Sequence, residues 1–459
     1  LSNSRLATQL SSQKDPQIRA LADMGIPQLG GYKPTARIYK LGLLLAAALT
    51  VCATLWMLSS SLSSVSSSFV NGIKGSKGHN NNNHHHNGFN PATANDDDLL
   101  VGRLPAARIS YDQPAEGERV NAAIIALVRN SELDGLRKSI RMFEDRFNRR
   151  FKYPYVLLND QNFTQEFRDG IAAITKNEVR YGVLDSDYWG YSPSVTPEGT
   201  EKKLEENKNR YLYGGSLSYR FMCRFQSGLF YKHPLVRDLD WYWRLEPDVE
   251  YFCDLDYDPF VFMRDRGMKY GFTIAPREGR RTVETLWYHT REWIKNNTDL
   301  LPERSLVNWV MGTDGHYNLC HFWSNFEIVD MSLYRSAAYE SYFQYLDNSQ
   351  GFFYERWGDA PIHSIAATLL LEKGQVHWFE DIGYKHPGNM HCPRDPGMLA
   401  KCICDPGKAY TYRSACQARF AKVNNMAKER MLEIIHNSEK EYHPSDKSED
   451  VDQAAKHRS

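Results

Sequence analysis

An uninterrupted apolar run at residues 41–58, LGLLLAAALTVCATLWML, is the strongest hydrophobic feature of the chain. The run contains no charged residue, and as a helix it would be about 27 Å long, close to the hydrocarbon thickness of a thin membrane. This pattern predicts a transmembrane helix, with a buried core helix and a cleaved signal peptide as alternatives. The long polar segment before the run exceeds the amino-terminal region of a signal peptide and favours a membrane anchor.

The pattern of polar positions divides the rest of the chain into four parts. Residues 1–40 contain six basic and two acidic residues, and the positive-inside rule predicts a cytoplasmic tail. Residues 59–117 are rich in Ser, Asn and His and have few large apolar residues, which is typical of a flexible stem. Residues 118–436 have the mixed pattern of a folded luminal domain, and residues 437–459 are expected to form a polar C-terminal tail.

Within the folded domain, short apolar runs alternate with segments of helical spacing. Strands are predicted at 120–128, 155–158, 241–245 and 270–275, and helices at 131–149 and 361–371. This order predicts an α/β fold, with a sheet flanked by helices, whose ligands bind at the carboxyl ends of strands. The domain has neither an internal repeat nor a Gly-rich phosphate-binding loop of the Walker or dinucleotide type.

Composition narrows the class of protein further. The chain has 459 residues, 42% of them hydrophobic, and its 56 basic residues balance its 56 acidic ones. This balance argues against a polybasic nucleic-acid-binding protein. Glycosylation acceptor sequences at Asn162 and Asn296 suggest an oxidising compartment.

Cysteine usage supports the same compartment. Cys52 lies in the apolar run and seven cysteines follow it, so at least one of the seven must stay unpaired. A zinc site is the alternative for the group near the C-terminus, but its C-x-C spacing is unusual for zinc and favours disulfides. This group comprises Cys392, Cys402, Cys404 and Cys416.

Carboxylates are concentrated at residues 243–260, WRLEPDVEYFCDLDYDPF. Oxygen ligands suit a hard divalent cation, and carboxylates after a strand can present one to a nucleotide diphosphate. An EF-hand loop at residues 254–258 lacks the required Gly and the final Glu. The alternative to a cation site is a solvated acidic loop. Glu246-Pro247-Asp248 resembles the D-x-D element of nucleotide-sugar glycosyltransferases.

Six longer motifs extend this likeness. They are NAAIIALVRNSEL, SYRFMCRFQSGLFYKHPLV, the acidic block, HYNLCHFWSNFEIVD, FYERWGDAPIHSIA and WFEDIGYKHPGNMHCP. With them, residues 117–430 resemble the fungal Golgi α-1,2-mannosyltransferases of glycosyltransferase family 15. The resemblance implies a GT-A-like fold, GDP-mannose as the donor, Mn²⁺ as the cofactor and retention of the α-anomeric configuration.

The resemblance also assigns the metal ligands and the donor-binding residues. Glu246 and His386 match the positions that hold the metal, and Asp248 either reaches the metal through water or orients the loop. Arg129 and Arg244 match positions suited to the nucleotide, because a guanidinium binds phosphate or ribose through its planar fork. Asp359 matches a position that contacts the sugar.

Two further matches concern the reacting centre. Glu327 is expected beside the anomeric carbon, either as a nucleophile or as a group that stabilises positive charge during same-face attack. Tyr219 is expected to donate its hydroxyl to a phosphate or sugar oxygen. Taken without the resemblance, Tyr219 is more typical of a core aromatic residue and Glu327 of a carboxylate at a strand edge.

These expectations define a type II Golgi membrane enzyme that adds mannose to O-linked or N-linked glycans of secreted or cell-wall proteins. Mannosylphosphate transfer and α-1,3 transfer are alternatives within the same family. A non-catalytic glycan-binding protein and a glycosidase are alternatives from other classes. The combination of Glu246, Glu327, Asp359 and His386 argues against both of them.

Overall fold

The computed structural model describes residues 117–440. The predicted cytoplasmic tail, membrane anchor and stem up to residue 116 lie outside the described residues, as do residues 441–459, so those expectations stay predictions. Within residues 117–440, none of the helices combines the length and the apolar character needed to cross a membrane. The last helix continues through residue 440, and the first residues of the predicted C-terminal tail are therefore helical.

A seven-stranded mixed sheet forms the centre of the described fold, in the order β3-β2-β1-β4-β8-β6-β9. The four predicted strands are present as β1, β2, β4 and β6, which confirms the α/β class. The strands of the described residues are β1 Ala122–Leu127, β2 Tyr155–Asn159, β3 Val179–Val183, β4 Trp241–Arg244, β5 Glu250–Tyr251, β6 Tyr270–Phe272, β7 Arg304–Ser305, β8 Ile328–Asp330, β9 Val376–Trp378, β10 Tyr384–His386, β11 Asn389–His391 and β12 Met426–Ala427.

One strand of this sheet, β8, runs in the opposite direction to the others. The pairs β2–β3, β1–β2 and β1–β4 are parallel, whereas β8 runs antiparallel to both of its neighbours, β4 and β6. The carboxyl ends of β1, β2 and β4 therefore meet at one edge of the sheet, where ligands of α/β proteins usually bind.

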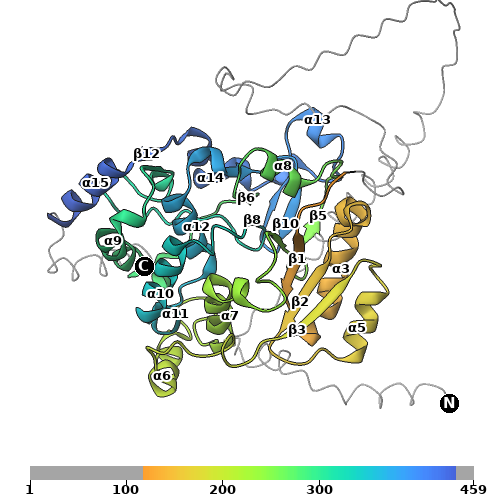
Figure 1. The fold of residues 1–459 in the computed structure, drawn as a ribbon, viewed down its shortest axis with the longest axis horizontal. Coiled ribbons are helices and arrows are strands. Elements are labelled where there is room, and N and C mark those ends of the chain that lie inside the picture. The colour runs from red at the N-terminus through yellow and green to blue at the C-terminus, as the bar shows by residue number, and fades with distance from the viewer. Residues whose placement is uncertain (1–116, 441–459) are drawn as a thin grey trace, which may run out of the picture. The chain divides into compact units, whose positions relative to one another are not determined.

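Helices cover both faces of the sheet. They are α3 Leu133–Phe143, α4 Arg149–Phe151, α5 Gln165–Ala172, α6 Pro197–Asn207, α7 Leu217–Gly228, α8 Pro259–Asp265, α9 Leu286–Asn296, α10 Ala337–Asn348, α11 Gly351–Tyr354, α12 Asp359–Leu370, α13 Pro396–Leu399, α14 Ala415–Lys422 and α15 Lys428–Lys440. In Figure 1, α3 and α5 lie on one side of β1–β3, and α7, α10 and α12 lie on the other.

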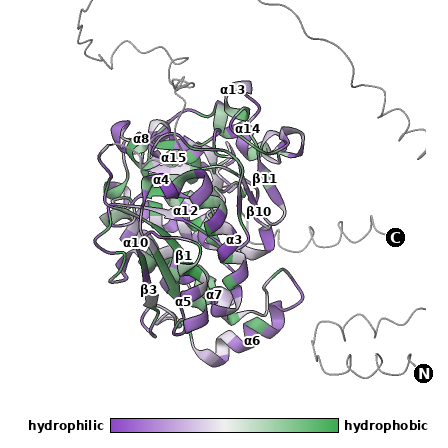
Figure 2. Cartoon of the chain, turned by 90° about the vertical axis from the view of Figure 1, so that its right-hand side faces the viewer, coloured by the Kyte–Doolittle hydropathy of each residue, from purple (hydrophilic) through white to green (hydrophobic). Residues whose placement is uncertain are grey.

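The continuous apolar run of β1 explains this arrangement. Ile124 packs into the core shared with α3 and α5, while its neighbour Ile125 packs into the core shared with α7 and α12. Both side chains are at most 5% exposed. A parallel strand buried on both faces needs apolar residues at every position, which is why this strand does not alternate. Figure 2 shows hydrophobic β1 in the interior of the fold.

A small second sheet, in the order β11-β10-β5, lies next to the end of β4. Strand β5 follows β4 after a short turn and pairs antiparallel with β10, so that Tyr251 lies opposite Tyr384. Strand β10 ends at His386. This pairing holds the segment that follows Glu246 against the strand that carries His386, although the two residues are far apart in the sequence.

Three disulfides involve the C-terminal segment, and two of them connect it to the rest of the fold. The three are Cys253–Cys402, Cys320–Cys416 and Cys392–Cys404, and the remaining described cysteine, Cys223, is free and buried. The structure therefore confirms the disulfide interpretation and contradicts the zinc alternative, because all four cysteines of the C-terminal group are paired.

Candidate active site

A cavity of about 840 Å³ lies at the carboxyl ends of β1, β2 and β4. Seven of the eight predicted site residues line it, and only Glu327 does not. The seven are Arg129, Tyr219, Arg244, Glu246, Asp248, Asp359 and His386. Residues separated by more than 250 positions in the sequence are thus assembled around one cavity.

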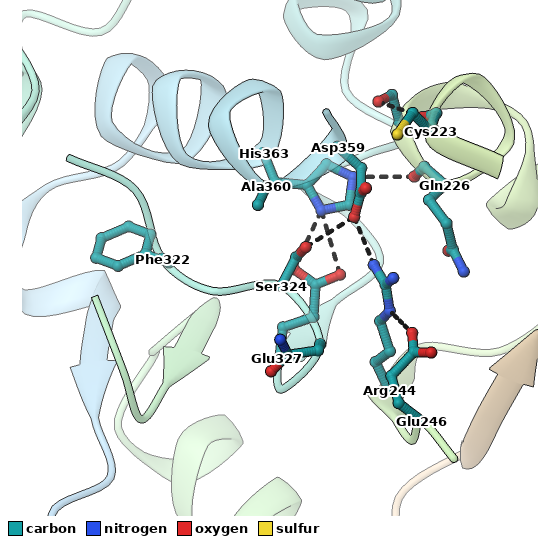
Figure 3. A network of polar contacts seen from close by, with 12 residues as sticks. Cys223, Gln226, Arg244, Glu246, Phe322, Ser324, Glu327, Asp359, Ala360 and His363 are labelled. Carbon is teal, nitrogen blue, oxygen red and sulfur yellow. Dashed lines mark hydrogen bonds and ion pairs between the residues drawn. The ribbon is translucent and has the colours of Figure 1, made fainter. Parts of the chain in front are cut away.

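Arg244, the last residue of β4, is the central charged group of the site (Figure 3). Its Nε donates to Glu246 Oε1 at 2.6 Å and its Nη1 donates to Asp359 Oδ2 at 2.6 Å. Arg244 is only 6% exposed. Burial alone would lower its pKa, but the carboxylates of Glu246 and Asp359 hold that pKa well above the usual value. The guanidinium is therefore a permanent charge that fixes two carboxylates.

Asp359 is the first residue of α12, where a carboxylate also interacts favourably with the positive end of the helix dipole. Its Oδ2 accepts a second hydrogen bond, from Ser324 Oγ at 2.7 Å. Burial opposes ionisation of Asp359, but Arg244, His363 and Ser324 together keep its pKa below the usual value. The carboxylate is therefore ionised at neutral pH. No partner among the described residues bonds its Oδ1.

Glu246 and His386 have the properties expected of metal ligands. The Nδ1 atom of His386 is buried and has no hydrogen-bond partner within residues 117–440. The ring packs against Trp323 at a centroid distance of 4.9 Å, and burial lowers the pKa of His386, which favours a neutral imidazole. A neutral imidazole together with a carboxylate suits a borderline cation such as Mn²⁺. The donor set therefore fits a divalent metal.

Asp248 lies at the outer edge of this group. Its backbone is left-handed, with a φ of 58°, and its N–H donates to the carbonyl of Gly135 at 3.2 Å. A Cβ at position 135 would lie 2.7 Å from Asp248 Oδ2, so a larger residue at this position of α3 would displace the Asp248 side chain. The Asp248 side chain is 57% exposed and lies 3.8 Å from Lys138 Nζ. This location suits a contact through water or an orienting role.

The remaining carboxylates of the acidic block do not belong to the site. Asp254 pairs with Arg146, Asp256 pairs with Lys401, and Asp258 accepts the first backbone N–H groups of α8. None of the three lines the cavity. Glu250 pairs with Lys385 and does not line the cavity either, so only the first part of the block, Glu246 and Asp248, lies at the cavity.

Tyr219 and Arg129 occupy two other walls of the cavity. The Tyr219 hydroxyl accepts a hydrogen bond from Arg356 Nη1 at 2.9 Å, and its ring stacks on Tyr213 at 4.4 Å. Burial raises the pKa of Tyr219, so the phenol is neutral. Arg129 follows β1 and is exposed, and its backbone N–H donates to Glu132 Oε2 at 2.7 Å. Its guanidinium is therefore available to a ligand.

Glu327 lies beneath the cavity wall and is fully buried. Its carboxylate accepts hydrogen bonds from Tyr242 and from Tyr270, the latter at 2.7 Å, and lies 3.1 Å from His363 Nδ1. Burial opposes ionisation, but His363, Arg244 and Tyr242 keep the pKa of Glu327 below its usual value. Glu327 itself does not line the cavity, whereas Ser324 and Asn325, just before it in the chain, do. Its expected place beside the reacting carbon stays a prediction.

His363 connects this buried carboxylate to α7 (Figure 3). Its Nε2 lies 2.9 Å from the carbonyl oxygen of Gln226. A carbonyl can only accept, so Nε2 must carry a proton. The remaining nitrogen, Nδ1, lies 3.1 Å from Glu327 Oε2 and 3.1 Å from the hydroxyl oxygen of Tyr334. The pair links α7, α12 and the segment that precedes β8.

Sequence reasoning missed several residues of the cavity. Arg356 and Ser324 hold Tyr219 and Asp359, and both are inside motifs that had been noted for neighbouring residues. Asn159 ends β2, lines the cavity, and has both side-chain amide atoms buried without a partner among the described residues. A polar residue at the end of an otherwise apolar strand was the signal that could have identified Asn159.

Comparison with known proteins identifies the family. A family model described as glycolipid 2-alpha-mannosyltransferase matches residues 15–425. The alpha-1,2 mannosyltransferase KTR1 of Saccharomyces cerevisiae is 46% identical over 317 residues, which are 68% of this chain and 81% of the relative. Glycolipid 2-alpha-mannosyltransferase 2 of Candida albicans is 48% identical over 304 residues, which are 65% of this chain and 66% of the relative.

Solved structures agree with this comparison. The mannosyltransferase Ktr4p of S. cerevisiae in complex with GDP has a TM-score of 0.64 at 37% identity, covering 68% of this chain and 84% of Ktr4p. Core-mannan synthase A of Aspergillus fumigatus in its Mn/GDP form has a TM-score of 0.61 at 38% identity, covering 70% of this chain and 87% of that protein.

The mixed α/β sheet and the cavity at its carboxyl edge are thus those of a glycosyltransferase. More specifically, the chain belongs to the glycolipid 2-alpha-mannosyltransferase family. The resemblance drawn from the six sequence motifs is confirmed.

The ion pair between Arg244 and Asp359 leads to a prediction about stability and pH. Because the pKa of folded Asp359 is below its usual value, its contribution to stability is complete above that value and is lost as the pH falls through the folded pKa. Asp359→Asn should lower the free energy of unfolding by about 2 kcal/mol at pH 7. The difference from the unsubstituted protein should shrink below about pH 4.

Denaturant unfolding of the two proteins at pH 7, 4 and 3 measures this difference. The matched control is Asp299→Asn, because Asp299 is exposed and its charge has no partner within residues 117–440. That control should change the free energy of unfolding by less than about 0.5 kcal/mol at each pH. A difference for Asp359→Asn that stays constant with pH would contradict the assignment.

Proposed function

We propose that the chain is a retaining α-1,2-mannosyltransferase that moves mannose from GDP-mannose to an acceptor mannose of O-linked or N-linked glycans, with Mn²⁺ as its cofactor. One observation carries this proposal. In a chain of this family, a single cavity combines Glu246 and the unpaired Nδ1 of His386 with Arg129 and Arg244 at the carboxyl ends of two strands. The Mn/GDP form of the relative from A. fumigatus supports the choice of nucleotide and metal.

The cavity supplies the groups that such a transfer needs. Glu246 and His386 would hold Mn²⁺, which would offset negative charge on the diphosphate. Arg129 binds phosphate or ribose oxygens through its exposed guanidinium. Arg244 orients Glu246 and Asp359, and the unpartnered Oδ1 of Asp359 accepts a hydrogen bond from a mannose hydroxyl. Tyr219, which is neutral, donates to a phosphate or sugar oxygen.

Glu327 supports this site from below. Two tyrosine hydroxyls and His363 occupy its carboxylate, and it has no exposed surface. A covalent nucleophile would have to leave these three partners to reach the sugar. We therefore favour same-face attack, in which the negative charge of Glu327 stabilises the positive charge that develops on the sugar.

Alternatives within the family differ in the product. Mannosylphosphate transfer would yield a phosphodiester, and α-1,3 transfer would yield a different linkage. A non-catalytic glycan-binding protein would release no GDP. Linkage analysis of the product made from GDP-mannose and an α-mannoside acceptor distinguishes all of these, and an α-1,2 linkage is expected.

Removal of the metal ligands should weaken donor binding. We expect GDP release to require Mn²⁺ and to stop in chelator, and Glu246→Gln and His386→Gln to weaken Mn²⁺-dependent GDP binding by at least about tenfold. Glu250→Gln is the matched control, because Glu250 belongs to the same acidic block but pairs with Lys385 outside the cavity. Calorimetric titration of GDP with and without Mn²⁺ measures the effect. Activity that persists unchanged in chelator would overturn the metal assignment.

Removal of the charge of Glu327 should affect chemistry more than binding. Glu327→Gln should lower kcat by about a hundredfold or more while GDP affinity stays nearly unchanged, because the carboxylate lies outside the cavity. Tyr270→Phe, which removes one of its hydrogen bonds, should lower kcat less. Single-turnover transfer and GDP titration separate the two quantities, with circular dichroism as the check on folding. A fully active Glu327→Gln enzyme would exclude any role for this charge.

We also propose that the protein is a single-pass type II Golgi membrane protein with a luminal catalytic domain. The apolar run at 41–58 and the basic residues before it support this topology. Three disulfides and the exposed glycosylation sequences at Asn162 and Asn296 suit a luminal environment. Protease treatment of sealed microsomes should leave the catalytic domain intact, and Asn162→Gln should remove one glycan. Digestion of the domain in the absence of detergent would show that it lies on the cytoplasmic side and would overturn the proposed topology.

A further inference from the structure

A second cavity, of about 450 Å³, adjoins the first, and Arg277 lines both. Arg280, Asp314, His316 and Asn318 are among its other lining residues. None of these four lines the first cavity, and none has a role in the donor site. The second cavity therefore lies next to the donor site without sharing its metal-ligand candidates.

A β-bridge and two backbone hydrogen bonds fix the backbone around Arg277. Residue 277 forms an antiparallel bridge with Cys320, which is bonded to Cys416. On either side of the bridge, the N–H of Glu278 donates to the carbonyl of Leu319 at 2.8 Å, and the N–H of His321 donates to the carbonyl of Pro276 at 3.1 Å. The position of the arginine-bearing segment is thus fixed, even though its side chains are exposed.

The positive charges of this segment lack carboxylate partners. Neither the Arg277 nor the Arg280 side chain forms a hydrogen bond or an ion pair with any residue in the described part of the chain. The acidic neighbour, Glu278, is already engaged by other groups. Its Oε1 accepts hydrogen bonds from Arg356 Nη2 at 3.2 Å, from Thr282 Oγ1 at 3.0 Å and from the backbone N–H of Gly279 at 2.8 Å.

Asp314 is the one carboxylate that lines the second cavity. Its Oδ1 accepts the backbone N–H of His316 at 3.1 Å, in a turn that Gly315 closes with a φ of 74°. The guanidinium groups of Arg277 and Arg280 thus share the cavity with a single carboxylate, which already accepts a hydrogen bond within its own turn. This surplus of positive charge, on side chains that bind oxyanions through a planar fork, defines a site for an anion.

We propose that the second cavity binds a phosphate ester carried by the acceptor glycan, while the acceptor mannose occupies the first cavity. A phosphate ester carries about −1.5 to −2 charges at neutral pH, which matches two arginines better than a single carboxylate does. The proposal rests on the proposed function, since it concerns the acceptor of the same transfer. It assigns to Arg280 a role in acceptor specificity.

The first experiment compares acceptors with the full enzyme. Transfer from GDP-mannose is measured to α-1,2-mannobiose, to the same disaccharide with a 6-phosphate on its reducing mannose, and to a mannosylated peptide rich in Asp. KM for the phosphorylated disaccharide should be about tenfold lower than for the neutral one. Equal KM values for these two would overturn the proposal, and an equal or larger preference for the acidic peptide would overturn the assignment to phosphate.

The second experiment changes Arg280. Arg280→Ala and Arg280→Gln should raise KM for the phosphorylated acceptor about tenfold, to the value of the neutral one. KM for the neutral acceptor and for GDP-mannose should not change, because Arg280 does not line the first cavity. Arg304→Ala is the matched control, since Arg304 is exposed and lines neither cavity. An increase in KM for GDP-mannose would assign the second cavity to the donor and overturn the proposal.

Direct binding separates this inference from the proposed function. Calorimetry with mannose 6-phosphate and with mannose requires no turnover, and the phosphate should strengthen binding about tenfold in the unsubstituted enzyme but not in Arg280→Ala. Loss of transfer to the neutral acceptor would count against the proposed function alone. Equal binding of the two sugars would count against the anion site alone.

Discussion

The buried guanidinium of Arg244 is the interaction on which the site depends. A charge removed from water must be paired, because a buried charge that is left without any partner costs about 3–5 kcal/mol. Arg244 therefore holds Glu246, two residues further along the chain, and Asp359, more than a hundred residues away, at 2.6 Å each. One ion-pair network thus joins the end of β4, a metal-ligand candidate and the first turn of α12.

The layer beneath this network fixes the backbone that carries it. Strand β8 pairs antiparallel with β4, and the N–H of Arg244 donates to the carbonyl of Glu327 at 3.0 Å. The Glu327 carboxylate in turn meets His363 from α12, whose other nitrogen donates to the carbonyl of Gln226 in α7. A buried acid and base can therefore set the distances between three elements without contacting a substrate.

Local patterns in the sequence predict the parts of the fold that repeat over several residues. The long apolar run of β1 and the helical spacing that follows it identify both elements. Strand β8 is not predicted, because its three residues are too few for alternation to show. The same limit applies to the site. Motifs identify Glu246 and His386, but only the pairing of β5 with β10 brings their strands together. The burial of Glu327 depends on tyrosines from two different strands, which no spacing reveals.

The balanced net charge of the chain hides a separation of charge within the domain. Beyond β5, the acidic residues of the 243–260 block form ion pairs or cap a helix. The arginines around the two cavities, in contrast, include several without carboxylate partners. Glu246 shows how a cation and Arg244 can use the same carboxylate. Its Oε1 bonds to Arg244, and its Oε2 has no partner among the described residues. Glu246 would therefore hold a metal while Arg244 stays paired with both Glu246 and Asp359.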